Sequence, residues 1–144
     1  MNYYSNNDEV SAVVQGFESC TITAADFNHP EHLTVAVAYL RNGTTEAAVC
    51  KMRDSLLRFL DHHAVDQRKY NETVTVFWIE MVAQELNRFD NHIALFEACN
   101  RINASLKDSK LASRYYSDEL LSSEEARLSF VAPDLREWRS AVSE

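Results

Sequence analysis

The segment FNHPEHL, residues 27–33, decides the fold class because it carries the start signals of a helix. Asn28 is a preferred N-cap residue, and Glu31 stands at the third helical position, where its carboxylate can accept the N-cap N–H. Pro30 suits a first helical turn, since its ring fixes φ near the helical value. The apolar residues that follow repeat at helical spacing up to a helix-ending Asn-Gly pair at residues 42–43: Leu33, Ala36 and Leu40.

Outward from this segment, helical spacing of apolar residues predicts four more main helices. Beyond residue 107 the pattern breaks into short pieces, one of which begins at the capping-box sequence SSEE, residues 122–125. The chain has only two glycines and two prolines, whereas sheets need turn residues at short intervals. We therefore expect an all-α bundle of four or five main helices with short helical turns in its C-terminal third. The four other main helices are expected over 8–20, from Thr44 or Thr45 to 63, over 70–89, and from Asp90 or Asn91 to 106.

The length of 144 residues predicts a single helical domain over 1–144. Residues 1–7 and 139–144 are expected to be frayed, because they lack apolar periodicity. The tail beyond Pro133 carries one large apolar side chain, Trp138, which is expected to anchor it.

The net charge of −8 argues against nucleic acid and against an anionic membrane surface as partners. No apolar run approaches the length of a membrane span, and the first eight residues do not resemble a signal peptide. The three cysteines are widely spaced and form no C-x-x-C pair, which is typical of reduced thiols. We therefore expect a soluble cytoplasmic protein.

Two histidines at the start of the helix that follows Asn28 are the first candidate site residues. At 100° per residue, His29 falls on the core-facing side and His32 about 60° away from it. Side chains three residues apart on a helix are close enough for two imidazoles to share one metal ion. His29 and His32 are therefore candidate ligands for a divalent metal or for a polar small molecule.

The helix expected over 70–89 supplies the other candidates. Its inward stripe holds Asn71, Thr75 and Trp78, whereas Glu72 falls to the side and Glu80 outside. Polar groups on such a stripe cost free energy unless they are hydrogen bonded or bind a ligand. The predicted ligand-binding residues are therefore His29, His32, Asn71, Thr75 and Trp78.

A purely structural role for each of these residues is the alternative. A histidine near a helix end often donates to a backbone carbonyl, Asn71 could be an N-cap, and Thr75 could bond to its own helix. Trp78 could be ordinary core packing. Two further histidines extend the pattern, because His63 and His92 also map to apolar helix faces, whereas His62 points outward.

The chain resembles a group of uncharacterised small bacterial proteins over about residues 24–135. The group's patterns are F-x-H-x-x-H-L, an L-x-x-F helix, Y-H-E-T-x-T-x-x-W, and Y-Y-S-x-x-x-L-x-S-x-x-A-R with a later P-D-L. The resemblance implies an all-α fold and no known activity. Asn71 stands where the group has a histidine, so a three-histidine metal site would lack one imidazole here, and zinc binds an amide oxygen poorly. The matching residues are Phe27, His29, His32, Leu33, Leu56, Phe59, Tyr70, Glu72, Thr73, Thr75, Trp78, Tyr115, Tyr116, Ser117, Leu121, Ser123, Ala126, Arg127, Pro133, Asp134 and Leu135.

Two functional hypotheses remain open at this point. In the first, the helices that begin after Asn28 and near Tyr70 run parallel, so their N-terminal ends meet and form a pocket. The two positive ends of the helix dipoles would then favour an anionic or polar small molecule slightly over a metal. In the second, the protein is a non-catalytic interaction module with structural histidines, and Trp138 packs on a partner or on a second copy of the chain.

Overall fold

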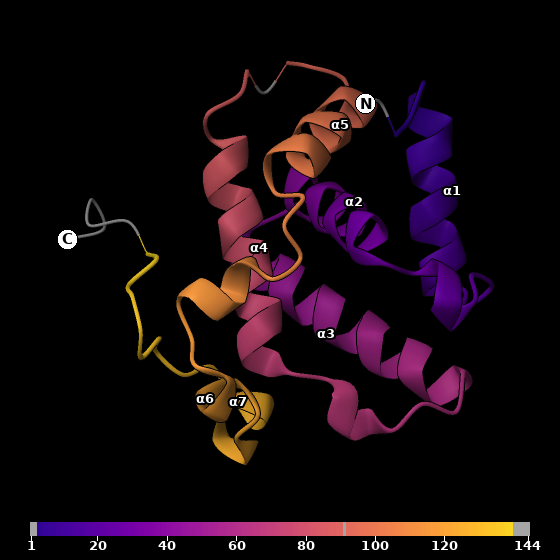
Figure 1. The fold of residues 1–144 in the computed structure, drawn as a ribbon. Coiled ribbons are helices and arrows are strands. Elements are labelled where there is room, and N and C mark those ends of the chain that lie inside the picture. The colour runs from indigo at the N-terminus through magenta and orange to yellow at the C-terminus, as the bar shows by residue number, and fades with distance from the viewer. Residues whose placement is uncertain (1–2, 91, 140–144) are drawn as a thin grey trace.

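The computed structural model describes residues 3–90 and 92–139 and is all-helical over this part of the chain. The predicted fold class is therefore confirmed: five main helices form a bundle, and short helical turns make up the C-terminal third (Figure 1). The main helices are α1 (Asn7–Glu18), α2 (His29–Arg41), α3 (Thr45–His62), α4 (Glu72–Leu86) and α5 (Leu95–Ser105). The shorter elements are α6 (Asp118–Leu121), α7 (Glu124–Leu128) and three 3₁₀ turns at Ala24–Asp26, Gln67–Lys69 and Leu111–Arg114.

Most helices begin where a local cap satisfies the free N–H groups of the first turn. The carboxylate of Glu31 accepts the N–H of Asn28 at 2.8 Å, so α2 starts where the sequence predicted. The Thr44 hydroxyl accepts the N–H of Ala47 at 3.1 Å and begins α3. In the same way, the Ser123 hydroxyl accepts the N–H of Ala126 at 3.2 Å and begins α7.

The start of α5 differs from the prediction. The helix begins at Leu95, not at Asp90 or Asn91, and Asn91 lies outside the described residues. The Asp90 carboxylate accepts the N–H of His92 at 2.9 Å, which holds this segment as a turn. His92 is exposed there, so the prediction that it faces the core is wrong.

Helix α2 lies at the centre of the bundle and packs against α1, α3, α4 and α5 (Figure 1). All seven residues from Leu33 to Tyr39 are buried, so this helix has no solvent-facing side over two turns. The buried Thr34 is accommodated because its hydroxyl donates to the carbonyl of Pro30 at 2.8 Å.

The C-terminal third wraps across the outer side of α4 and is fixed there by a small aromatic cluster. Trp138 is 6% exposed and packs against Phe77 of α4, with ring centroids 5.2 Å apart. Its indole N–H donates to the hydroxyl of Tyr116 at 3.2 Å, and that hydroxyl donates to the carbonyl of Val131 at 2.9 Å. Trp138 therefore anchors the tail within its own chain, which removes the reason for expecting it to pack on a partner.

The two ends of the chain are described in part. The N–H groups of Tyr3 and Tyr4 both donate to the Asn100 amide oxygen of α5, at 2.9 and 3.0 Å. Arg139 donates to the Glu80 carboxylate at 3.0 and 2.8 Å. Fraying was expected for residues 1–7 and 139–144. Of these, residues 1–2 and 140–144 lie outside the described part.

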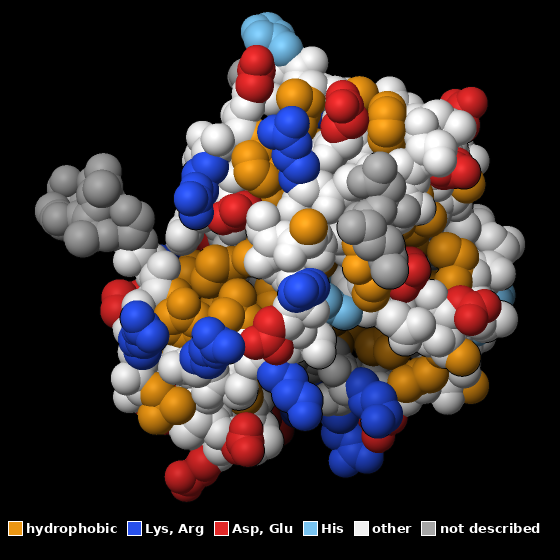
Figure 2. All heavy atoms as spheres, turned by 45° about the horizontal axis from the view of Figure 1, so that its top comes forward, with side chains coloured by type: hydrophobic (Ala, Val, Ile, Leu, Met, Phe, Trp, Pro, Cys, Tyr) orange, Lys and Arg blue, Asp and Glu red, His pale blue; other side chains and the backbone are white. Residues whose placement is uncertain are grey.

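The described helices bear on two further expectations. Within that part of the chain, each helix is too short or too polar to cross a membrane. Cys20 and Cys99 are buried, Cys50 is exposed, and all three thiols are free. Figure 2 shows Lys and Arg side chains interspersed with Asp and Glu on the face it draws, without a continuous basic surface.

Candidate functional site

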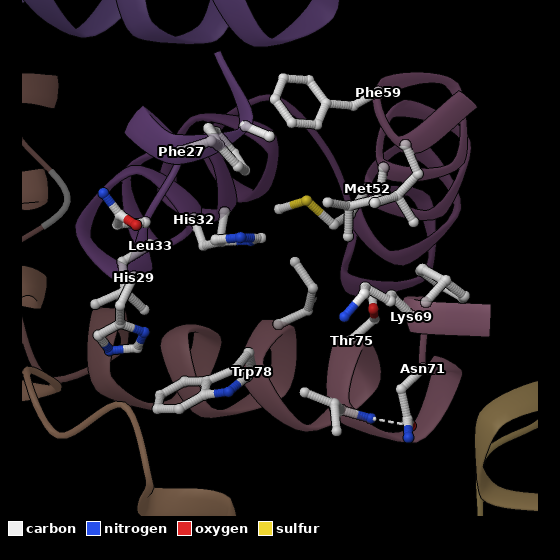
Figure 3. A pocket seen from close by; sticks show the side chains of 18 of the residues that line it. Phe27, His29, His32, Leu33, Met52, Phe59, Lys69, Asn71, Thr75 and Trp78 are labelled. Carbon is white, nitrogen blue, oxygen red and sulfur yellow. Dashed lines mark hydrogen bonds between the residues drawn. The ribbon is translucent and has the colours of Figure 1, made fainter. Parts of the chain in front are cut away.

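All five predicted site residues line one cavity of about 460 Å³ between α2, α3 and α4 (Figure 3). The side chains of His29 and His32 come from the first turn of α2, and those of Thr75 and Trp78 from the inner face of α4. Their role in binding a ligand stays a prediction, whereas their common location is a structural fact. The apolar part of the lining consists of Ala24, Phe27, Leu33, Ala36, Met52, Leu56, Phe59, Leu60, Val65, Val74, Trp78 and Ile79.

His29 is held in place by one backbone carbonyl and one aromatic ring. Its Nε2 lies 2.8 Å from the carbonyl oxygen of Leu106, so Nε2 carries a proton and donates. The imidazole packs edge-on against the Trp78 ring, with centroids 4.8 Å apart. The other ring nitrogen, Nδ1, has no hydrogen-bond partner among the described residues and is left for water or a ligand.

His32 lies deeper in the wall and projects into the cavity (Figure 3). Its imidazole packs on the Phe27 ring at a centroid distance of 4.4 Å and forms no hydrogen bond with the described residues. Burial lowers the pKa of His32 to about 4, and the neighbouring His29 adds to this effect. At neutral pH His32 is therefore an uncharged imidazole that offers the cavity one donor and one acceptor.

Asn71 has the structural role that the sequence left as the alternative. Its amide oxygen accepts the N–H of Val74 at 3.0 Å and caps α4, as the dashed line in Figure 3 shows. Its amide nitrogen donates to the carbonyl of Leu121 at 2.7 Å and attaches α6 to the start of α4. Both polar atoms of Asn71 are thus used within the chain, although the residue borders the cavity. Thr75, which is 8% exposed, lies one turn further along α4.

The N-terminal ends of α2 and α4 do not meet, contrary to the prediction. His29 packs beside Trp78, which lies seven residues beyond Asn71, or about 10 Å along α4 at 1.5 Å per residue. The start of each helix also has a side-chain acceptor from its own segment. Glu31 accepts at the start of α2, and Asn71 accepts at the start of α4. The argument that two convergent helix dipoles favour an anion therefore does not hold for this cavity.

The helical wheel missed a partly buried ion pair beside the site, in which the Glu72 side chain is 12% exposed and the Arg53 side chain 36%. Glu72 was expected at the side of α4, but its carboxylate accepts from Arg53 Nε and Nη2 of α3 at 2.9 and 2.6 Å. The Tyr70 hydroxyl also donates to Glu72, at 2.6 Å. The Arg53 guanidinium lowers the pKa of the Glu72 carboxyl, whereas burial raises the pKa of Tyr70, which lines the cavity. The helical wheel could not include this partner, because Arg53 reaches Glu72 from another helix.

The described residues do not assemble a metal site of ordinary composition. No group of three or more His, Cys, Asp or Glu side chains in this part of the chain is placed to hold an ion. His63 is half-buried against Phe59, and its Nε2 lacks a hydrogen-bond partner, but it does not line the cavity. Any metal bound by His29 and His32 would need its remaining ligands from water or a substrate.

Comparison with known proteins gives no direct assignment. No family model, no curated protein and no solved structure matches the chain.

Proposed function

We propose that the protein binds a small, largely apolar molecule with one hydrogen-bonding group in the cavity between α2, α3 and α4. The observation that carries this proposal is the cavity itself: about 460 Å³ in volume and lined mainly by apolar side chains. Binding sites for small molecules typically measure 300–1,000 Å³ and combine an apolar wall with a few convergent polar groups. This chain has that combination.

The hydrogen-bonding group of the ligand has a defined counterpart in the wall. His32 is uncharged at neutral pH and has no partner in the described part of the chain, so its ring nitrogens are free to bond a ligand hydroxyl or carbonyl. Such a hydrogen bond offsets the free-energy cost of burying the polar imidazole of His32. Nδ1 of His29 offers a second acceptor nearby, fixed in orientation by the bond from Nε2 to the Leu106 carbonyl.

Two other interpretations are supported less well. In a metal site, His29 and His32 would supply two imidazoles, but the described residues add no third ligand. In an interaction module, all five residues would be structural. That role fits Asn71, whose two amide atoms bond within the chain, and Nε2 of His29, but it leaves the cavity and the orientation of His32 unexplained.

The proposal is tested with 1-octanol as the probe, titrated into the protein at pH 7 in a calorimeter. Leu56 of α3 lines the cavity, whereas its neighbour Leu57 is half-buried outside it. Leu56→Trp fills part of the cavity and should weaken octanol binding at least tenfold, because the alkyl chain loses its apolar contacts. Leu57→Trp adds the same side chain elsewhere on α3 and should leave binding unchanged.

Two outcomes would contradict this proposal. One is the absence of heat or of a saturable isotherm for octanol with the unmodified protein. The other is an equal effect of the two tryptophan substitutions on binding. Circular dichroism and the denaturant midpoint of each variant establish that both remain folded.

A further inference from the structure

One charged side chain, Lys69, borders the cavity among the described residues that line it. It belongs to the 3₁₀ turn Gln67–Lys69, which precedes α4. Figure 3 draws Lys69 and Thr75 toward one end of the cavity and His29 toward the other end. The wall between these two ends is mainly apolar, with Met52 and Trp78 facing each other across the space.

The carboxylates closest in sequence to Lys69 are already bound to other cations. Arg68 donates to both oxygens of Asp66 through Nε and Nη2, at 2.7 to 3.2 Å. Arg53 holds the Glu72 carboxylate in the same two-point manner. Lys69 itself forms no ion pair within residues 3–90 and 92–139. Its charge at the cavity edge is therefore not compensated by the described part of the protein.

We infer that the ligand is a carboxylate with an unbranched apolar body, such as a medium-chain alkanoate. This inference rests on the proposed function and adds the class of ligand. The carboxylate lies at Lys69 with the Thr75 hydroxyl as a second donor, and the alkyl chain runs along Met52 toward Trp78 and His29. His32 is uncharged at neutral pH and does not compete as a cation for the head group. An ammonium at the wet edge and an apolar interior together favour an amphipathic anion.

The test compares octanoate with 1-octanol, which has the same chain length and no charge. At pH 7 and low salt we expect octanoate to bind about two- to fivefold more tightly than octanol, the range for one partly exposed ion pair. Lys69→Met keeps a long apolar stem without the charge, and should reduce the ratio of octanoate affinity to octanol affinity to about one. Lys51→Met changes the net charge equally on the exposed side of α3 and should have no effect. Raising the salt concentration should narrow the octanoate advantage.

The outcomes separate this inference from the proposal on which it rests. Equal affinities for octanol and octanoate, or an undiminished octanoate preference in Lys69→Met, would overturn the carboxylate inference and leave the cavity proposal intact. Saturable binding of neither probe would overturn both. Tighter octanoate binding that Lys69→Met abolishes and Lys51→Met preserves supports the carboxylate assignment.

Discussion

His32 shows how a single residue couples the cavity to the stability of the protein. Folding places its imidazole against Phe27 in the cavity wall, where protonation is disfavoured. Exposed histidines such as His62 are not subject to this burial. The same environment that makes His32 a neutral hydrogen-bonding group at pH 7 must therefore make the fold sensitive to acid.

We expect the free energy of unfolding to fall by about 2 kcal/mol between pH 7 and pH 5, chiefly because of His32. Its folded pKa of about 4 lies below the ordinary value of 6.5, so the unfolded chain takes up the proton first as the pH falls. The stability is fully present above pH 6.5 and is lost progressively down to about pH 4. Urea titrations at several pH values measure it.

A His32→Leu variant provides the control, because it keeps an apolar side chain of similar size without a titratable group. Its stability should change much less between pH 7 and pH 5. The Glu72 and Asp134 carboxyls, whose pKa values are lowered by hydrogen bonds, act in a more acidic range. A fall of the same size in His32→Leu would assign the effect to another group.

At the scale of single elements, one buried hydroxyl of α4 makes three of the hydrogen bonds that join this helix to the C-terminal third. The Thr73 hydroxyl lies 2.8 Å from the carbonyl of Ala126 and 3.0 Å from that of Ser129, and it accepts the N–H of Val131 at 3.1 Å. These bonds attach α7 and the following segment to α4. Thr73 is fully buried, so water cannot replace them.

Replacing Thr73 by Val should lower the free energy of unfolding by about 1–3 kcal/mol, because the isosteric methyl group leaves buried backbone groups unpaired. Thr73→Ser keeps the hydroxyl and should cost less than the valine substitution. Denaturant unfolding followed by circular dichroism compares the two. A smaller loss for the valine variant than for the serine variant would indicate that the methyl group, and not the hydroxyl, holds the segment.

Three helix starts could be predicted from the sequence because their caps are made by neighbouring residues of typical capping types. These are the starts of α2, α3 and α7, whose capping bonds reach at most three residues along the chain: Glu31 to Asn28, Thr44 to Ala47 and Ser123 to Ala126. The start of α5 also has a local bond, because Glu97 accepts the N–H of Ala94 at 3.2 Å, but alanine at the N-cap position is not a start signal in the sequence.

The candidate site was predictable as a set of residues but not as an arrangement. Helical periodicity alone placed five side chains on inward faces, and all five border the cavity. Periodicity says nothing of the angle at which two helices cross, so the expected meeting of the N-terminal ends of α2 and α4 was wrong. It also could not place Glu72 inside or Lys69 at the cavity edge, because both depend on contacts between elements.

At the scale of the whole molecule, burial divides the three thiols into two classes. Cys50 is exposed on α3, whereas Cys20 and Cys99 are buried, and burial raises the pKa of Cys99 to about 12. Because the thiolate is the reactive form, we expect one fast reaction with a disulfide reagent in the native protein and three in denaturant. Mass spectrometry without reductant should show no intramolecular disulfide. Rapid labelling of Cys99 in the native state would contradict this arrangement.

The central position of α2 has a consequence for the synthesis of the chain. Helix α2 is covered by α1 and α3, which neighbour it in sequence, but also by α4 and α5, which are translated later. Tyr4 likewise bonds to Asn100, almost a hundred residues further on. A ribosome-bound chain that ends before residue 105 therefore still displays part of the apolar surface of α2. The native burial of this α2 surface is complete only after α5 has been synthesised. Until then the surface is available to chaperones that recognise apolar segments.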